Sequence, residues 1–281
     1  MQPRRRAGPL LFCAAVGLAL VGGCGPGLGA GSKWAEQPLV EDEKPVGALP
    51  PGANENLPPP SSGRTTHTLG QPRSREPGGV APGGGRVLGT FRNTYYDFPR
   101  EADHKGDAVA LMNASCQPIA QVPRGFHDAV CVQGSGVLKR GGVVSFAKRD
   151  CACAEICPRT SQKICFDALD PKQFPFGRGA AGTAIHPFRT IAADTDVLPM
   201  GTVVYIPELD GVPRGGGSGE PLDGCFVVED RGLRVKGEHV DIFTGHPQHT
   251  AALEQIVPSN HGVTVVVQAP KCAPRASPLP R

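Results

Sequence analysis

The chain has 281 residues, of which 29 are Lys or Arg and 26 are Asp or Glu, and only 5% are aromatic. Setting aside the three arginines at positions 4–6 leaves 26 basic against 26 acidic residues. This balance excludes the basic footprint of a nucleic-acid-binding protein, and the length favours one sizeable domain with flanking segments over two large domains.

The N-terminus has the pattern of a bacterial secretory signal. After the arginines comes an apolar run, Leu10 to Val21, that is too short to span a membrane. The run leads into Leu20-Val21-Gly22-Gly23-Cys24, which resembles a lipobox. Residues 1–24 are therefore predicted to be a lipoprotein signal peptide with the lipid on Cys24, an anchor that attaches to the membrane without spanning it. Ordinary signal cleavage nearby, with Cys24 incidental, is the alternative.

Residues 25–86 are predicted to be a disordered linker. Glycine and proline supply 24 of the 64 residues from 25 to 88, which exceeds their share in packed domains. Such a tether gives an anchored domain reach. The folded domain is predicted over residues 87–272, followed by a loose tail at 273–281.

Short strands separated by glycine and proline dominate the predicted domain. Runs of β-branched and aromatic residues bounded by turn residues occur at 89–96, 143–146, 202–206, 225–228, 239–243 and 263–268. The best helix candidate is 250–257. This pattern favours a mainly β fold closed into a barrel, with residues 103–178 as an insert or second lobe.

The first strand ends in two aromatic residues, Tyr95 and Tyr96. Aromatic rings at a strand end can stack on sugar faces, and they also commonly pack in a core. Both interpretations stay open.

Cysteine content gives a second strong signal. Apart from Cys13 and Cys24, eight of the ten cysteines remain. An even number in an exported chain predicts disulfides, whose connectivity the sequence does not reveal. The alternative, a zinc or iron–sulfur site in the cluster at 151–157, is disfavoured by its spacing, so no metal is expected. The disulfide candidates are Cys116, Cys131, Cys151, Cys153, Cys157, Cys165, Cys225 and Cys272.

Two apolar strands near the C-terminus each carry an aspartate. Alternation places Asp230 with Phe226 and Val228 on one face of the first, and Asp241 with His239 on one face of the second. A carboxylate among apolar neighbours is costly to desolvate, so its pKa tends to rise. A raised pKa suits a general acid near neutral pH. The alternative is an aspartate that caps a turn or pairs with a nearby basic residue.

These strands, together with Ile191-Ala192-Ala193-Asp194 and residues 198–206, resemble the three-aspartate (3D) domain. That domain is shared with the membrane-bound lytic transglycosylase A family. The similarity is closest over about residues 180–269, and the three aspartates fall at Asp194, Asp230 and Asp241. One turn departs from the family pattern, because Arg231-Gly232-Leu233 stands where Thr-Gly-Gly is usual.

The resemblance implies a double-psi β-barrel flanked by a Cys-rich insert or second lobe. It also implies cleavage of the β-1,4 bond between N-acetylmuramic acid and N-acetylglucosamine in peptidoglycan, with formation of a 1,6-anhydro ring. Asp241 would be the general acid/base, Asp230 a second carboxylate, and Asp194 a support for the same network or a turn residue.

Further expectations concern binding and location. Tyr95, Tyr96, His239 and Gly245 are candidate substrate-binding residues, although a lone histidine beside an aspartate, such as His239 beside Asp241, is more often a structural hydrogen-bond partner. The expected partners are peptidoglycan glycan strands and, through the lipid, a membrane; no cofactor is expected, and the oligomeric state is not predicted. Because Gly25 is not an aspartate, the periplasmic face of the outer membrane is the expected location.

Two alternative functions remain at this point. The first is a glycosidase on the same barrel that uses water. The second is a non-catalytic lipoprotein that binds the cell wall, which the departures at Arg231 and Leu233 favour.

Overall fold

The computed structural model describes residues 77–81, 83–215 and 219–273. The predicted signal peptide, Cys24, most of the predicted linker and nearly all of the predicted tail lie outside these residues. Across the described ranges, no helix combines the length and apolar character needed to cross a membrane.

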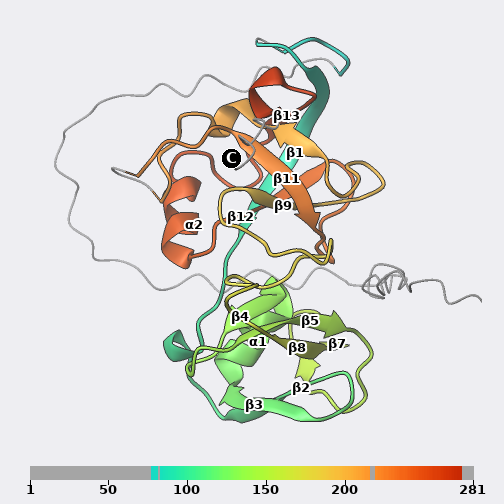
Figure 1. Ribbon diagram of the computed structural model, residues 1–281, viewed down its shortest axis with the longest axis vertical. Coiled ribbons are helices and arrows are strands. Elements are labelled where there is room, and N and C mark those ends of the chain that lie inside the picture. The colour runs from blue at the N-terminus through green and yellow to red at the C-terminus, as the bar shows by residue number, and fades with distance from the viewer. Residues whose placement is uncertain (1–76, 82, 216–218, 274–281) are drawn as a thin grey trace, which may run out of the picture. The chain divides into compact units, whose positions relative to one another are not determined.

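Six strands form a closed barrel in the order β1-β12-β9-β11-β10-β13 (Figure 1). β1 runs parallel to β12, and β9 runs parallel to β11, whereas the other neighbours are antiparallel. The mainly β fold is thus confirmed, and the mixed six-stranded barrel agrees with the double-psi barrel that the resemblance implies. The strands are β1 (Arg86–Tyr96), β9 (Thr190–Ala193), β10 (Val203–Tyr205), β11 (Cys225–Asp230), β12 (His239–Phe243) and β13 (Val263–Val267).

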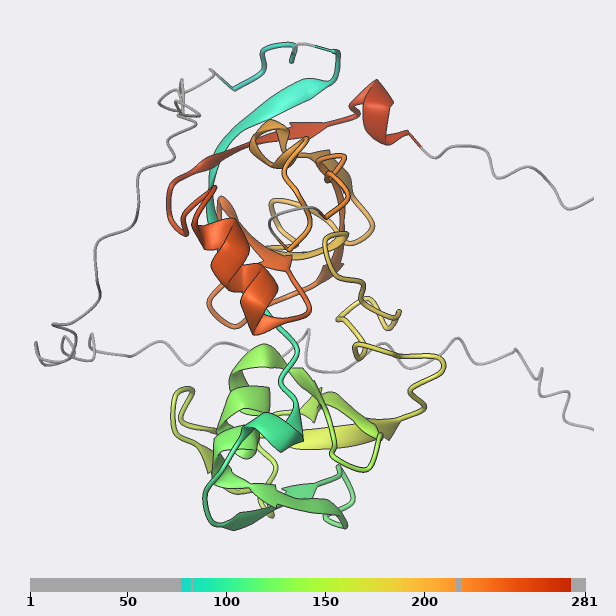
Figure 2. The ribbon, with the colours of Figure 1, turned by 90° about the vertical axis from the view of Figure 1, so that its left-hand side faces the viewer.

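The barrel interior is filled by branched and aromatic side chains. Ile191, Val228, Ile242 and Val265 are all completely buried there, because alternate residues of each strand point inward. Helix α2 (Pro247–Glu254) closes against this core through Leu253 (Figure 2).

Helix α2 begins and ends three residues earlier than predicted. His246 is its N-cap, and the His246 ring accepts a hydrogen bond from the amide of Gln248. Pro247 occupies the first turn, where a missing amide hydrogen costs nothing. Pro247 therefore marks the start of the helix, which the apolar pattern of residues 250–257 alone did not indicate.

Residues 108–169 form the second lobe that the sequence predicted (Figure 1). Its sheets pair β2 with β3, β5 with both β4 and β8, and β6 with β7. Phe126 and Phe166 are the large buried side chains of its small core. The elements are β2 (Ala108–Met112), β3 (Pro118–Pro123), α1 (Arg124–Gln133), β4 (Ser135–Val137), β5 (Val143–Lys148), β6 (Ile156–Cys157), β7 (Gln162–Lys163) and β8 (Cys165–Leu169).

A separate apolar cluster joins the lobe to the barrel. It includes Phe98 and Val143 beside Ile185 and Phe243. The bridge between Arg100 and Val137 adds backbone pairing. Short 3-10 turns complete the fold at η2 (Glu101–Asp103), η3 (Pro207–Leu209) and η4 (Pro270–Cys272).

All eight candidate cysteines lie in disulfides. The lobe contains Cys116–Cys153, Cys131–Cys157 and Cys151–Cys165. The barrel contains Cys225–Cys272. That bridge ties the start of β11 to the segment after β13.

Candidate active site

A cleft of about 420 Å³ lies between the outer face of the barrel and the second lobe. Its volume is in the range of small-molecule and glycan sites. The barrel contributes Thr94, Ala192, Asp230 and Asp241, and the lobe contributes residues from 131 to 164. The two aspartates that the sequence singled out are therefore both in the cleft.

Strand register brings these aspartates together. Asp230 on β11 and Asp241 on β12 are both paired with Ala192 of the intervening strand β9. Thr94 on β1 is paired with Asp241 from the other side. Two strand spacings, roughly 9.5 Å, separate the two aspartate backbones. Ala192 carries only a methyl group and lines the cleft between the two aspartates.

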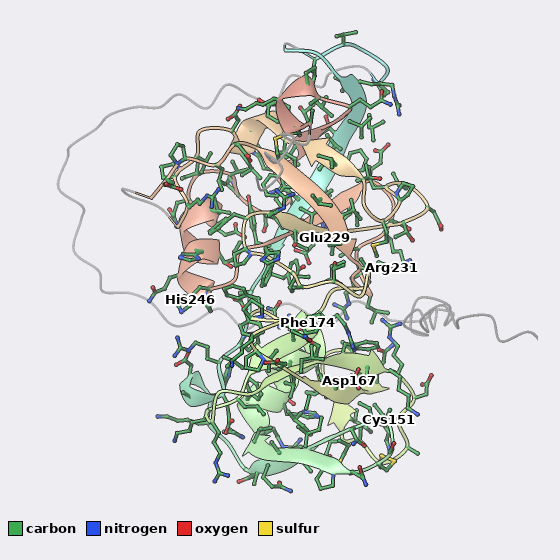
Figure 3. The ribbon with its side chains drawn as sticks, viewed as in Figure 1. Cys151, Asp167, Phe174, Glu229, Arg231 and His246 are labelled. Carbon is green, nitrogen blue, oxygen red and sulfur yellow. A yellow bond between two sulfur atoms is a disulfide. The ribbon has the colours of Figure 1, made fainter. Side chains whose placement is uncertain are left out.

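A β-bulge turns Asp230 toward the cleft. The register of β11 against β9 shifts between Val228 and Asp230. Phe226 and Val228 point into the barrel core, whereas Asp230 lines the cleft. The prediction that Asp230 shares a face with these two residues was wrong, because the extra residue, Glu229, reverses the alternation. Figure 3 labels Glu229 and Arg231, which flank Asp230.

Three donors surround the Asp230 carboxylate. The amides of Ala180 and Arg231 donate to Oδ1 at 3.0 and 2.9 Å, and the Tyr96 hydroxyl donates to Oδ2 at 3.1 Å. Burial raises the pKa of Asp230 to about 6, while these three hydrogen bonds oppose the rise. Hydrogen bonds of this kind favour the charged form, so Asp230 is built to carry a negative charge.

Asp241 has a different environment. Thr94 Oγ1 donates to Asp241 Oδ1 at 2.7 Å. Burial raises the pKa of Asp241 to about 6, and the Asp230 charge adds to the rise, while Thr94 and Arg92 oppose it. Asp241 accepts from the Thr94 hydroxyl, whereas Asp230 accepts from three donors, so Asp241 is the member of the pair that retains a proton more readily.

Thr94 also connects Asp241 to His239. Thr94 Oγ1 lies 2.8 Å from His239 Nε2, and His239 Nδ1 lies 3.3 Å from the Arg234 carbonyl oxygen. Burial and the charge of Arg92 lower the pKa of His239, so the neutral ring prevails near neutral pH.

One hydroxyl proton therefore serves two neighbours. The His239 Nδ1–H faces the Arg234 carbonyl oxygen, so the neutral ring has an unprotonated Nε2. When Asp241 is protonated, Asp241 can donate to Thr94, and Thr94 to Nε2. When Asp241 is ionised, Thr94 donates to Asp241, and Nε2 donates to Thr94 only if the ring is protonated. His239 is thus a partner of the acid through Thr94.

The remaining predicted site residues have other roles. The Tyr96 ring packs against Phe243, with centroids 4.9 Å apart, and it is only 7% exposed, while its hydroxyl donates to Asp230. Tyr95 borders the cleft, but its hydroxyl donates to the Val257 carbonyl oxygen at 2.6 Å. Both tyrosines pack against apolar clusters and also line the cleft, so their role in substrate binding stays a prediction.

Asp194 and Gly245 are not among the residues that line the cleft. Asp194 accepts from the amides of Gly237 at 2.9 Å and Asp196 at 3.2 Å, and the Gly237 bond holds the pKa of Asp194 below its usual value. Asp194 is a turn residue that fixes the approach to β12. Gly245 has φ +75°, and a Cβ there would collide with the Pro187 ring.

The fold and the site define a class of protein: a mainly β protein with a closed barrel and two aspartates in a cleft. The family model of the 3D domain matches residues 189–267, a range that contains all three predicted aspartates. Residues 189–267 therefore match the 3D domain. No curated protein sequence matches the chain significantly.

Several solved structures are similar to part of the chain. Escherichia coli MltA with bound chitohexaose has 16% identity and a TM-score of 0.45, over 64% of this chain and 72% of that one. A membrane-bound lytic murein transglycosylase from Agrobacterium tumefaciens has 14% identity and a TM-score of 0.40, over 63% and 73%. LtgG of Burkholderia pseudomallei has 17% identity and a TM-score of 0.31, over 61% and 63%.

Proposed function

We propose that the protein is a peptidoglycan lytic transglycosylase. The observation that carries the proposal is the pair of aspartates in a 3D-domain cleft, one with three hydrogen-bond donors and the other with one. Two carboxyl groups with unlike environments are the usual basis for dividing acid and charge-stabilising roles.

The proposed reaction needs no nucleophile from the enzyme. Protonated Asp241 gives its proton to the glycosidic oxygen, and the bond from that oxygen to C1 of the muramic residue breaks. The muramic 6-hydroxyl then forms the new bond to C1, and its proton returns to the Asp241 carboxylate. The acid is thereby regenerated, and the attack is intramolecular, so the effective concentration of the nucleophile is high.

Asp230 stabilises positive charge as it develops on the sugar ring. An ionised carboxylate in a partly buried cleft acts strongly on nearby charge, because water screens it less. The donors from Ala180, Arg231 and Tyr96 keep Asp230 ionised while Asp241 holds its proton.

Hydrolysis is the second candidate. A retaining glycosidase would need Asp230 as its nucleophile, and three donors on that carboxylate reduce its nucleophilicity. A wall-binding protein without catalysis would have no use for two aspartates whose pKa values are raised to about 6. These considerations favour transglycosylation.

The test is the mass spectrum of fragments that residues 25–281 release from purified sacculi, compared with the Asp241→Asn variant. We expect anhydromuramoyl products, and a loss of turnover of about 100- to 10,000-fold in the variant with binding to sacculi retained. Reducing-end products would instead establish hydrolysis. Release of no fragment, with sacculi still bound, would establish a binding protein.

We further propose that lipid on Cys24 anchors the enzyme at the periplasmic face of the outer membrane. The support is the lipobox-like sequence and the absence of an aspartate at position 25. Recovery of a Cys24→Ser variant in the membrane fraction at the wild-type level would contradict it.

A further inference from the structure

Arginine is concentrated around the cleft. Among the described residues that line it, six are arginines and two are aspartates. Arg92 and Arg231 come from the barrel strands and turns, and Arg149 comes from the lobe. The full set is Arg92, Arg149, Arg159, Arg178, Arg231 and Arg234. A cleft with this lining attracts anions to a site whose catalytic groups are themselves acidic.

Two of these arginines, Arg149 of the lobe and Arg231 of the barrel, line the cleft from opposite walls. Arg149 follows β5 of the lobe, where its Nε donates to Gln162 Oε1 at 2.9 Å and its guanidinium lies 5.4 Å from the centroid of the Phe146 ring. Arg231 follows Asp230 on the barrel. Burial lowers the pKa of Arg149, the charge of Asp150 raises it, and the positive charge of Arg231 lowers it further. An anion between Arg149 and Arg231 would relieve the repulsion between their guanidinium groups.

The neighbouring arginines hold the surrounding backbone in place. Arg178 donates to Asp167 at 2.5 Å, which balances its charge. Arg234 donates to the carbonyl oxygen of Arg159 at 3.2 Å, and this contact links the turn before β12 to the turn between β6 and β7. Both walls of the cleft are thus fixed around Arg149 and Arg231.

We infer that Arg149 and Arg231 form a carboxylate-binding subsite for the muramic residue of the glycan. The inference rests on the proposed function and adds the feature of the substrate that the cleft recognises. Guanidinium groups bind carboxylates through paired, charge-assisted hydrogen bonds. In a peptidoglycan strand, only the muramic residues carry a carboxyl-bearing lactyl group, either free or extended by a peptide that ends in its own carboxylate.

The position of the subsite also sets the direction of the glycan. Arg231 directly follows Asp230, whose proposed role is to stabilise charge on the muramic ring. A muramic carboxylate held by Arg231 would place that ring beside Asp230 and leave the neutral N-acetylglucosamine toward Asp241. The departure of this turn from the family pattern is then a recognition element of this chain.

The test measures binding in the Asp241→Asn background, where glycans are not consumed. Three ligands are compared: chitohexaose, which is neutral; glycan strands stripped of peptide, which keep free lactyl carboxylates; and glycan strands that carry peptides. The test variant carries both Arg149→Gln and Arg231→Gln. The controls are Arg140→Gln and Arg189→Gln, two exposed arginines that do not line the cleft.

We expect anionic glycans to bind about tenfold or more tightly than chitohexaose, and the double variant to lose this preference while its affinity for chitohexaose changes less than about twofold. A preference confined to stripped strands identifies the lactyl carboxylate, and one confined to peptide-bearing strands identifies a peptide carboxylate; either supports the subsite. Equal weakening for chitohexaose, or an unchanged preference, overturns it. If the Asp241→Asn protein with both arginines intact bound no glycan, the proposed function would be overturned as well.

Discussion

At the scale of single residues, the reactivity of the site depends on the hydroxyl of Thr94. Thr94 is the side-chain donor to Asp241, and its hydrogen bond holds the pKa of Asp241 lower than burial and Asp230 would set it. The acid works only while protonated, so activity should fall as pH rises through about 6, the pKa of Asp241.

Substitution of Thr94 by valine should therefore move the alkaline limb of the pH profile of kcat/KM upward. Valine has nearly the same shape and cannot donate, so the pKa of Asp241 rises and the acid stays protonated to higher pH. Loss of one hydrogen bond to a charged group corresponds to a shift of about one pH unit. Thr94→Ser keeps the hydroxyl and should keep the limb of the wild type; a limb that moves downward in the valine variant would contradict this role.

The residue scale also marks the limit of what the sequence could predict at the site. Alternation placed Asp241 and His239 on one face, and the structure puts both in the cleft. It failed for Asp230, because a bulge is invisible to a period-two pattern. Thr94 and Arg149 lie far from Asp241 in the chain, so no local spacing could bring them to the site.

At the scale of elements, the bulge in β11 is secured by the segment before β9. The amide of Ala181 donates to the Glu229 carbonyl oxygen at 3.0 Å, and the amide of Ala180 donates to Asp230 at 3.0 Å. Gly179 allows this approach, since a Cβ there would overlap the Glu229 carbonyl oxygen and lie 2.8 Å from an Ile185 methyl group.

A single methyl group at position 179 should therefore disturb catalysis. Gly179→Ala forces the segment away from β11, and Asp230 loses its Ala180 donor. We expect turnover to fall at least about tenfold, with a loss of stability of about 1–3 kcal/mol. Because the lost donor had favoured the ionised form, the pKa of Asp230 rises, and the acidic limb of the pH profile should move to higher pH.

The matched control is Gly142→Ala in the lobe. A Cβ at Gly142 would meet only Leu138 Cδ1, at an ordinary contact distance of 3.4 Å. If both variants lost turnover equally, or if the acidic limb stayed in place in Gly179→Ala, the bulge would have no special part in the reaction.

Barrel strands were more predictable than lobe elements for a physical reason. Five barrel strands show as apolar runs long enough to recognise, because each buries one face in the common core. The two-residue strands β6 and β7 are too short to carry periodicity. Their structure depends on disulfides whose pairing no local pattern encodes.

At the scale of the whole molecule, the two parts are stabilised by different means. The barrel has the larger apolar core, with one disulfide, Cys225–Cys272. The lobe has a smaller core, and its three disulfides join residues 37, 26 and 14 apart in sequence. Since a disulfide contributes about 2–4 kcal/mol and a domain has about 5–15 kcal/mol in total, the lobe depends on its disulfides more than the barrel does.

Reduction should therefore unfold the lobe before the barrel. Hydrogen exchange measured with and without a reductant should rise first in peptides of residues 108–169, while residues 189–267 stay protected. Cleavage of sacculi should be lost at that stage, because the cleft loses Arg149 and its lobe wall although Asp230 and Asp241 remain in a folded barrel.

The paired variant Cys225→Ser with Cys272→Ser gives the reverse comparison. It should lower barrel stability by about 4 kcal/mol at most and leave lobe exchange unchanged. Simultaneous exchange of both regions on reduction would mean that lobe and barrel unfold as one cooperative unit.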